Sequence, residues 1–125
     1  MRAYIVIAAG IIMVLSSAAH ALLGWPALSL ELVKSGVAED LSGALSLGWY
    51  FGSVSMLAFG IITVIFGLRF KRGDRSGAAA IAVIAVGYLL FGALAIVLRG
   101  FNPHFLLFIA TGLLAGPPLL GAQRG

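Results

Sequence analysis

The chain's two histidines, His20 and His104, are the side chains best suited to proton or metal chemistry. An imidazole can act as a general acid, a general base or a metal ligand near neutral pH. His20 follows a long apolar run, and His104 follows the pair Asn102-Pro103. The sequence contains no cysteine, which excludes disulfides and thiolate metal sites. Any site must therefore be built from histidine, carboxylate, hydroxyl and aromatic groups.

The composition places these histidines in a membrane protein. Of 125 residues, 62% are hydrophobic and only 10% are charged, whereas soluble proteins have about 25% charged residues. About 20 helical residues span the hydrocarbon core of a bilayer. Because backbone groups must be satisfied internally in lipid, each span is expected to be a helix. The sequence has uncharged runs of at least this length at residues 3–30, 41–68, 76–98 and 100–123.

We therefore predict an all-α fold: an integral membrane four-helix bundle that forms one transmembrane domain over residues 1–125. The runs are continuous and lack the alternation of a transmembrane barrel. The predicted helices cover residues of about 3–24, 40–68, 76–98 and 103–120.

Trp25-Pro26 is expected to end the first helix, because proline disfavours helix in the residue before it. A short helix or loop over residues 27–35 should then lie on the membrane surface between helices one and two, closed by Gly36. Asn102 is the expected N-cap of the fourth helix, with Pro103 in its first position.

Two helix faces are expected to pack against neighbours. Small residues let helices approach closely in lipid. The second helix has a largely small or weakly polar face: Trp49, Gly52, Ser53, Met56, Gly60, Thr63 and Gly67. The third helix has a packing stripe of Ala80, Ile84, Gly87, Phe91 and Ala95, with Tyr88 beside it.

The N-terminus also has the layout of a signal peptide: Met1-Arg2, an apolar run and an Ala19-His20-Ala21 sequence. The apolar run continues through Leu22 and Leu23, which makes it long enough to span. This favours retention as the first helix. The sequence alone leaves open whether residues 1–21 are ever removed.

The charge distribution predicts an orientation. Basic residues gather in cytoplasmic loops. With a cytoplasmic N-terminus, Arg2, Arg69, Lys71, Arg72, Arg75 and Arg124 lie inside and only Lys34 and Arg99 lie outside. We therefore predict a multi-pass protein of the cytoplasmic (inner) membrane with both termini cytoplasmic. The same rule explains the net charge of +4, so no nucleic acid partner is inferred.

This topology gathers candidate site residues at the outer boundary. The predicted outer-leaflet pocket consists of His20, Trp49, Tyr50, Ser53, Arg99 and His104. An ionisable residue within a membrane segment is a functional hypothesis by default. The structural alternative is that the aromatic residues and Arg99 anchor the helices at the interface, while His20 only bonds a neighbouring helix.

These residues permit several functions. We prefer the binding of an apolar ligand (lipid, quinone or isoprenoid) or of a membrane partner near the outer leaflet. The alternative is an enzyme that acts on a lipid-like substrate, with His20 and His104 as acid and base; whether the protein is an enzyme is left open. A haem-binding subunit needs axial ligands, for which two histidines are a minimal basis. No metal-ligand spacing such as HExxH occurs, and no cofactor is predicted.

Two further functions are considered: transport, and assembly into a larger membrane complex. The chain has the size and helix count of small multidrug-resistance transporters, but its first helix lacks the carboxylate that they need, and the family is rejected. The expected partners are membrane lipids, with a homo-oligomer or a larger membrane complex left open.

Overall fold

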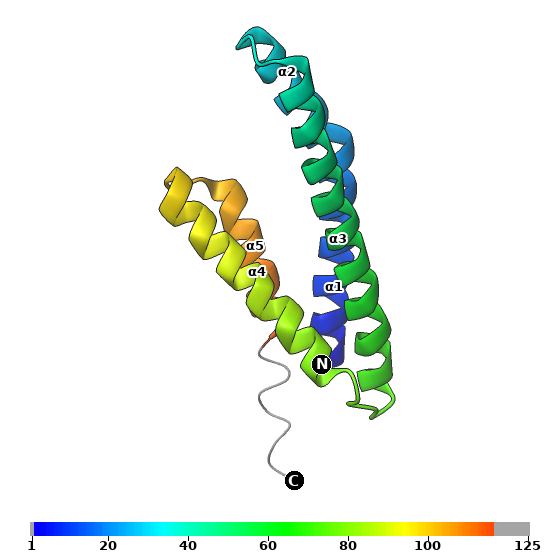
Figure 1. The fold of residues 1–125 in the computed structure, drawn as a ribbon. Helices are drawn as coiled ribbons and strands as arrows, with labels where there is room; N and C mark the ends of the chain where they lie inside the picture. Colours follow the sequence, from blue (N-terminus) through cyan, green and yellow to red (C-terminus); the bar gives the residue numbers. More distant parts are fainter. Residues whose placement is uncertain (1, 117–125) are drawn as a thin grey trace.

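The computed structural model describes residues 2–116, and this part of the chain is all-α, as predicted. A first long helix consists of α1 (Arg2–Ala19), the π-helical segment η1 (His20–Gly24) and α2 (Trp25–Lys34). It is followed by α3 (Glu39–Lys71), α4 (Ala78–Arg99) and α5 (Pro103–Ala115) (Figure 1). The described residues thus form four helices and no strand.

Three of these helices are long and apolar enough to cross a membrane: Arg2–Lys34, Glu39–Lys71 and Ala78–Arg99. This is the pattern of a small multi-pass membrane protein. Helix α5 has 13 residues, or about 20 Å, which is less than the roughly 30 Å of a hydrocarbon core. The predicted fourth helix was longer, but residues 117–120 lie outside the described part.

The predicted break at Trp25-Pro26 is wrong, because the helix continues through it. Gly24 and Trp25 both have right-handed helical dihedrals, and Pro26 lies in the first turn of α2. Proline cannot donate a helical hydrogen bond. The chain accommodates it with a π turn, in which the Trp25 N–H donates to the His20 carbonyl five residues back. As a result, α2 extends the first helix instead of leaving it for the surface (Figure 1).

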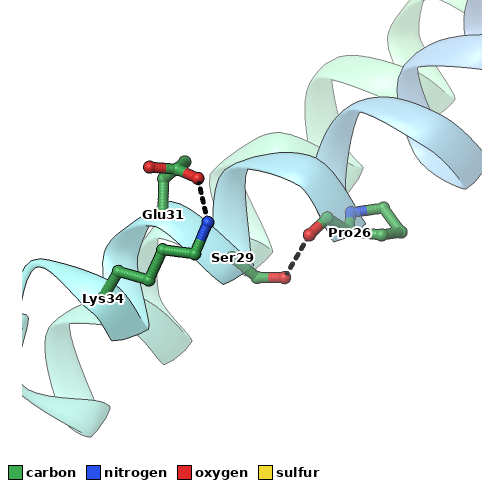
Figure 2. Close-up of polar contacts among 4 residues, drawn as sticks. All are labelled: Pro26, Ser29, Glu31 and Lys34. Carbon is green, nitrogen blue, oxygen red and sulfur yellow. Dashed lines mark hydrogen bonds and ion pairs between the residues drawn. The ribbon is translucent and has the colours of Figure 1, made fainter.

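Helix α2 carries two local polar contacts (Figure 2). The Lys34 Nζ lies 2.8 Å from Glu31 Oε1, and the Ser29 hydroxyl donates to the Pro26 carbonyl at 3.0 Å. Both side chains of the ion pair are exposed, so it contributes at most about 1 kcal/mol. Gly36 follows with a φ of +68°, in the closing position that the sequence predicted.

The long first helix and α3 form a first hairpin that packs through small residues. Ser53, Gly60, Thr63 and Gly67 of the predicted face are buried. A Cβ on Gly60 would lie 2.9 Å from the Gly10 carbonyl oxygen and 2.7 Å from Val14 Cγ2. The two backbones therefore touch at this point, and only glycine fits between them.

Helices α4 and α5 form a second hairpin, turned by Gly100 with a φ of +80°. The Asn102 side chain caps α5 by accepting from the His104 N–H at 2.9 Å, as predicted. The hairpins meet mainly through α1 and α5, whereas α3 and α4 make few contacts. They converge at the turn between α3 and α4 and diverge toward the opposite end (Figure 1).

The packing face of α4 differs from the predicted stripe. Its buried residues are Ile81, Ile84, Ala85, Tyr88 and Gly92. Ala80, Gly87 and Phe91 are exposed, so only Ile84 of the stripe is in the core. The packing face differs because α4 packs closely on α5 but makes few contacts with α3, and the side facing α3 is left open.

Candidate functional site

A cavity with two lobes lies between the diverging hairpins. The larger lobe has a volume of about 530 Å³ and the smaller about 390 Å³. Both fall within the size range of small-molecule sites, which is about 300–1,000 Å³. The lobes share residues from all four helices: His20, Met56, Tyr88, Phe91 and Phe108. We call this space the interhairpin cavity.

The two lobes lie between different helix pairs. The larger lobe adds residues of the long first helix and α5, among them Ser16, Leu23, His104 and Thr111. The smaller lobe adds Gly52 and Phe59 of α3 and Val83 and Gly87 of α4. Val83 is 73% exposed, so the smaller lobe is open on its flank between α3 and α4.

His20 is held from three sides. Its Nδ1 lies 2.8 Å from the Ser53 hydroxyl oxygen. Its ring stacks on the Trp49 indole, with centroids 4.1 Å apart and planes 7° from parallel. Its carbonyl accepts from Trp49 Nε1 at 2.8 Å, in addition to the Trp25 N–H of the π turn. The proline-induced π turn and the indole therefore fix the backbone and the ring of His20 together.

The serines around His20 tie the first hairpin together at the same level. The Ser17 hydroxyl donates to the Ser53 carbonyl at 2.7 Å, and both residues are buried. The Ser53 hydroxyl also lies 3.1 Å from the Trp49 carbonyl, to which it can donate. In that arrangement His20 donates from Nδ1, and its Nε2 remains as an acceptor. Interhelical bonds of this kind hold helices together in lipid.

His104 reaches the same larger lobe from the first turn of α5. Its ring makes edge contacts with Phe105 and Phe108, at centroid distances of 6.3 and 5.9 Å. Phe108 also packs against Phe91, with centroids 4.7 Å apart. His104 is exposed and its ring contacts these two phenylalanines, whereas the His20 ring accepts or donates a hydrogen bond at Ser53.

Tyr88 contributes a hydroxyl without a partner. The residue lines both lobes and is only 7% exposed. Over the described residues, its hydroxyl oxygen is the buried side-chain polar atom that no hydrogen bond satisfies. Leaving such a group unpaired costs about 1–3 kcal/mol, so a buried unpaired hydroxyl beside a cavity is a candidate ligand contact.

The structure brings together some of the residues proposed from the sequence. His20, Trp49 and His104 line the larger lobe. Ser53 lies behind His20 and supports it without lining either lobe. Tyr50 packs instead on Trp25, at a centroid distance of 6.1 Å. Arg99 is exposed at the end of α4 and lines neither lobe.

Sequence reasoning missed the middle of the cavity. Met56, Tyr88, Phe91 and Phe108 form its shared wall, yet Met56 and Phe91 were assigned to packing faces. Among these residues, Tyr88 is the one whose place in a site the sequence could have indicated. A phenolic hydroxyl near the middle of an apolar helix must find a partner or remain unsatisfied.

The lining limits the chemistry. The described residues around the two lobes include no Asp, Glu, Lys or Arg, and the titratable side chains among them are His20, His104 and Tyr88. They can donate or accept hydrogen bonds and exchange protons. Nowhere in residues 2–116 do three or more histidine, aspartate or glutamate side chains gather as a metal site would require. The pairing of the histidines on a haem stays a prediction.

Comparisons with family models, with curated proteins and with solved structures found no match for this chain.

Proposed function

We propose that this protein is a small multi-pass membrane protein that binds an apolar molecule in the interhairpin cavity. The observation that carries this proposal is the lining of the cavity. Its walls are mostly aliphatic and aromatic, with His20 and His104 as polar groups in the larger lobe. Binding sites for small molecules typically combine an apolar wall with a few fixed polar groups. The flank between α3 and α4 gives such a molecule a route of entry from lipid.

The proposal includes a topology. Helix α3 has 33 residues, or about 50 Å, so it exceeds a hydrocarbon core of about 30 Å. The basic turn after α3 belongs on the cytoplasmic side by the positive-inside rule. The histidine-bearing ends of the helices then lie toward the outer leaflet of the cytoplasmic membrane, and both termini are cytoplasmic.

Cysteine labelling tests this topology, because the chain has no native cysteine. Ser35 and Ser76 are exposed and lie beyond opposite ends of α3. In intact cells, an impermeant maleimide should label a cysteine at position 35 and label one at position 76 only after permeabilisation. Labelling of both positions from the same side would contradict the topology.

A quinone with an apolar tail tests ligand binding. The variant Trp25→Phe leaves Trp49 as the single tryptophan, because the chain has only two. Trp49 lines the larger lobe, so its fluorescence should report on the cavity. In nanodiscs of neutral lipid, added decylubiquinone should quench Trp49 saturably. Quenching that rises linearly without saturation would indicate partition into lipid alone and would overturn the proposal.

Two glycines provide a matched pair of variants in the same background. Gly87 lines the smaller lobe, and a Cβ there would meet nothing within 4 Å. Gly43 has the same open surroundings but lies outside both lobes. Gly87→Phe should occupy the lobe and weaken saturable quenching by at least about tenfold, or ~1.4 kcal/mol. Gly43→Phe should leave it unchanged, and equal effects of the two variants would argue against a site in the cavity.

A further inference from the structure

The Tyr88 hydroxyl beside the interhairpin cavity forms no hydrogen bond within residues 2–116. Its residue lies deep in the bundle. Tyr88 is the eleventh residue of α4, which runs from Ala78 to Arg99. It therefore lies about 15 Å along the axis from either end of the helix. Because α4 is long and apolar enough to span a membrane, Tyr88 lies at the level of hydrocarbon, well below the headgroups.

From the lining and this depth, we propose that the cavity selects a neutral molecule whose oxygen-bearing head accepts a hydrogen bond from the Tyr88 hydroxyl. The inference rests on the proposed function and narrows its ligand class. The eligible molecules are those with a long apolar body and an uncharged alcohol, phenol or carbonyl head. Lipids with a phosphate head are excluded.

The first argument is hydrogen bonding. The Tyr88 hydroxyl is buried and has no partner within residues 2–116. The two buried threonine hydroxyls are satisfied within their own helices: Thr63 donates to the Phe59 carbonyl and Thr111 to the Leu107 carbonyl, each at 2.7 Å. Tyrosine cannot reach its own helix backbone in this way, because its hydroxyl stands at the end of a rigid ring. A ligand oxygen would supply the missing acceptor.

The second argument is charge. No Lys or Arg lines either lobe in the described part of the chain, and Arg99 lies outside both. An anionic head would lose its hydration without gaining a permanent counter-charge, which is strongly unfavourable in a low-dielectric site. A neutral oxygen can be desolvated at a much lower cost when it accepts one hydrogen bond.

Three probes with the same tail test this inference in nanodiscs at about pH 8, where an ordinary imidazole is neutral. Farnesol has a neutral hydroxyl head, farnesyl phosphate has an anionic head and farnesene has none. Each competes with decylubiquinone for saturable quenching of Trp49. Farnesol should compete best, at a concentration at least about tenfold lower than farnesyl phosphate. Equal or better competition by farnesyl phosphate would overturn the inference.

The variant Tyr88→Phe removes the hydroxyl and keeps the ring. Farnesol should then bind about three- to tenfold more weakly, while farnesene should be unaffected. The thermal stability of the unliganded variant should be equal or higher, because an unsatisfied group has been removed. Unchanged farnesol affinity would contradict the role of Tyr88.

These results also separate the two proposals. If decylubiquinone quenching never saturates, the binding function itself fails. If it saturates but the probes do not differ in their competition, the site exists and only the choice of a neutral head is wrong.

Discussion

The two ends of the bundle are built from the same residue types and yet pack in opposite ways. Toward the basic turn, Gly10 and Gly60 bring α1 and α3 into backbone contact, and Gly67 admits Ile7. Beside the interhairpin cavity, Gly52 and Gly87 have no such close neighbours. These glycines therefore close the contact between α1 and α3 near the basic turn, which we call the closed end, and leave space beside the interhairpin cavity, which we call the open end.

The difference arises from what faces each glycine. At the closed end, the partners are helix backbones and branched aliphatic chains, which interdigitate. At the open end, aromatic rings stand between the hairpins: Trp49, Phe91, Phe105 and Phe108. Each of these stacked or edge-on aromatic pairs lies within one hairpin, as for Trp49 with His20 and Phe91 with Phe108, so over the described residues no ring-to-ring contact closes the space between the hairpins. A small residue therefore makes a contact or a cavity according to its neighbours.

The largest expected effect of a single change is at the closed end. In Gly60→Leu, the new Cβ would lie 2.9 Å from both the Gly10 carbonyl oxygen and the Val14 amide nitrogen. These are backbone atoms, so the helices must separate. Overpacking of this kind typically costs about 1–3 kcal/mol. We expect a lower midpoint for unfolding in sodium dodecyl sulfate titrations followed by circular dichroism.

Gly43→Leu is the control for this variant, because a Cβ on Gly43 meets nothing within 4 Å on the same helix. Its unfolding midpoint should stay close to that of the unmodified protein. Because Leu favours helix more than Gly does, a similar loss in both variants could not come from helix propensity and would contradict the contact between α1 and α3 as its cause.

A smaller effect is expected at the open end when the support of His20 is removed. In Ser53→Ala, the His20 Nδ1 loses its partner at 2.8 Å. The loss of one hydrogen bond of this kind costs about 1 kcal/mol. The ring should also become more mobile against Trp49. We expect a broadened or shifted imidazole resonance in nitrogen-edited NMR spectra and weaker quenching by decylubiquinone.

Ser55→Ala provides a matched control on the same helix. The Ser55 hydroxyl donates to the Phe51 carbonyl at 2.8 Å, as Ser53 donates to the Trp49 carbonyl, but Ser55 is only partly buried and its hydrogen bond stays within α3. The variant should leave the imidazole resonance in place. If Ser53→Ala does so as well, the bond to Ser53 does not position His20.

The sequence predicted the closed end better than the open end. The helices, the Gly36 and Asn102 caps and the small face of α3 follow from local patterns and from adjacent packing. The end of the first helix was misplaced because proline was expected to stop it. Whether a π turn absorbs a proline depends on the donors around it, here Trp49 and Trp25, and periodicity does not reveal them.

The candidate site was predicted in part. Topology alone gathers His20, Trp49 and His104 at one end of the bundle, because alternate helix ends meet there. It does not give the rotation of each helix or the angle between the hairpins. Those two quantities place Tyr50 and Arg99 outside the cavity and turn Phe91 into one of its walls.

The smallest expected effect is at the basic turn. The Asp74 carboxylate accepts from the Ser76 N–H at 2.9 Å. Hydrogen bonds from Ser76, first from its backbone and then from its side chain, lower the pKa of Asp74 below its ordinary value of 3.8, with a lesser contribution from Arg69. A carboxyl with a depressed pKa stabilises the fold above its unfolded pKa and loses this contribution as pH falls through the folded value. Below pH 3.8, amide exchange at Ser76 should therefore accelerate relative to the intrinsic rate at each pH.

Asp74→Asn retains an acceptor oxygen but does not titrate, so the relative exchange rate of the Ser76 amide in this variant should not change over that range. Because Asp74 is fully exposed and far from the cavity, saturable quenching of Trp49 should be the same in both proteins, and a change there would show that the closed and open ends are coupled.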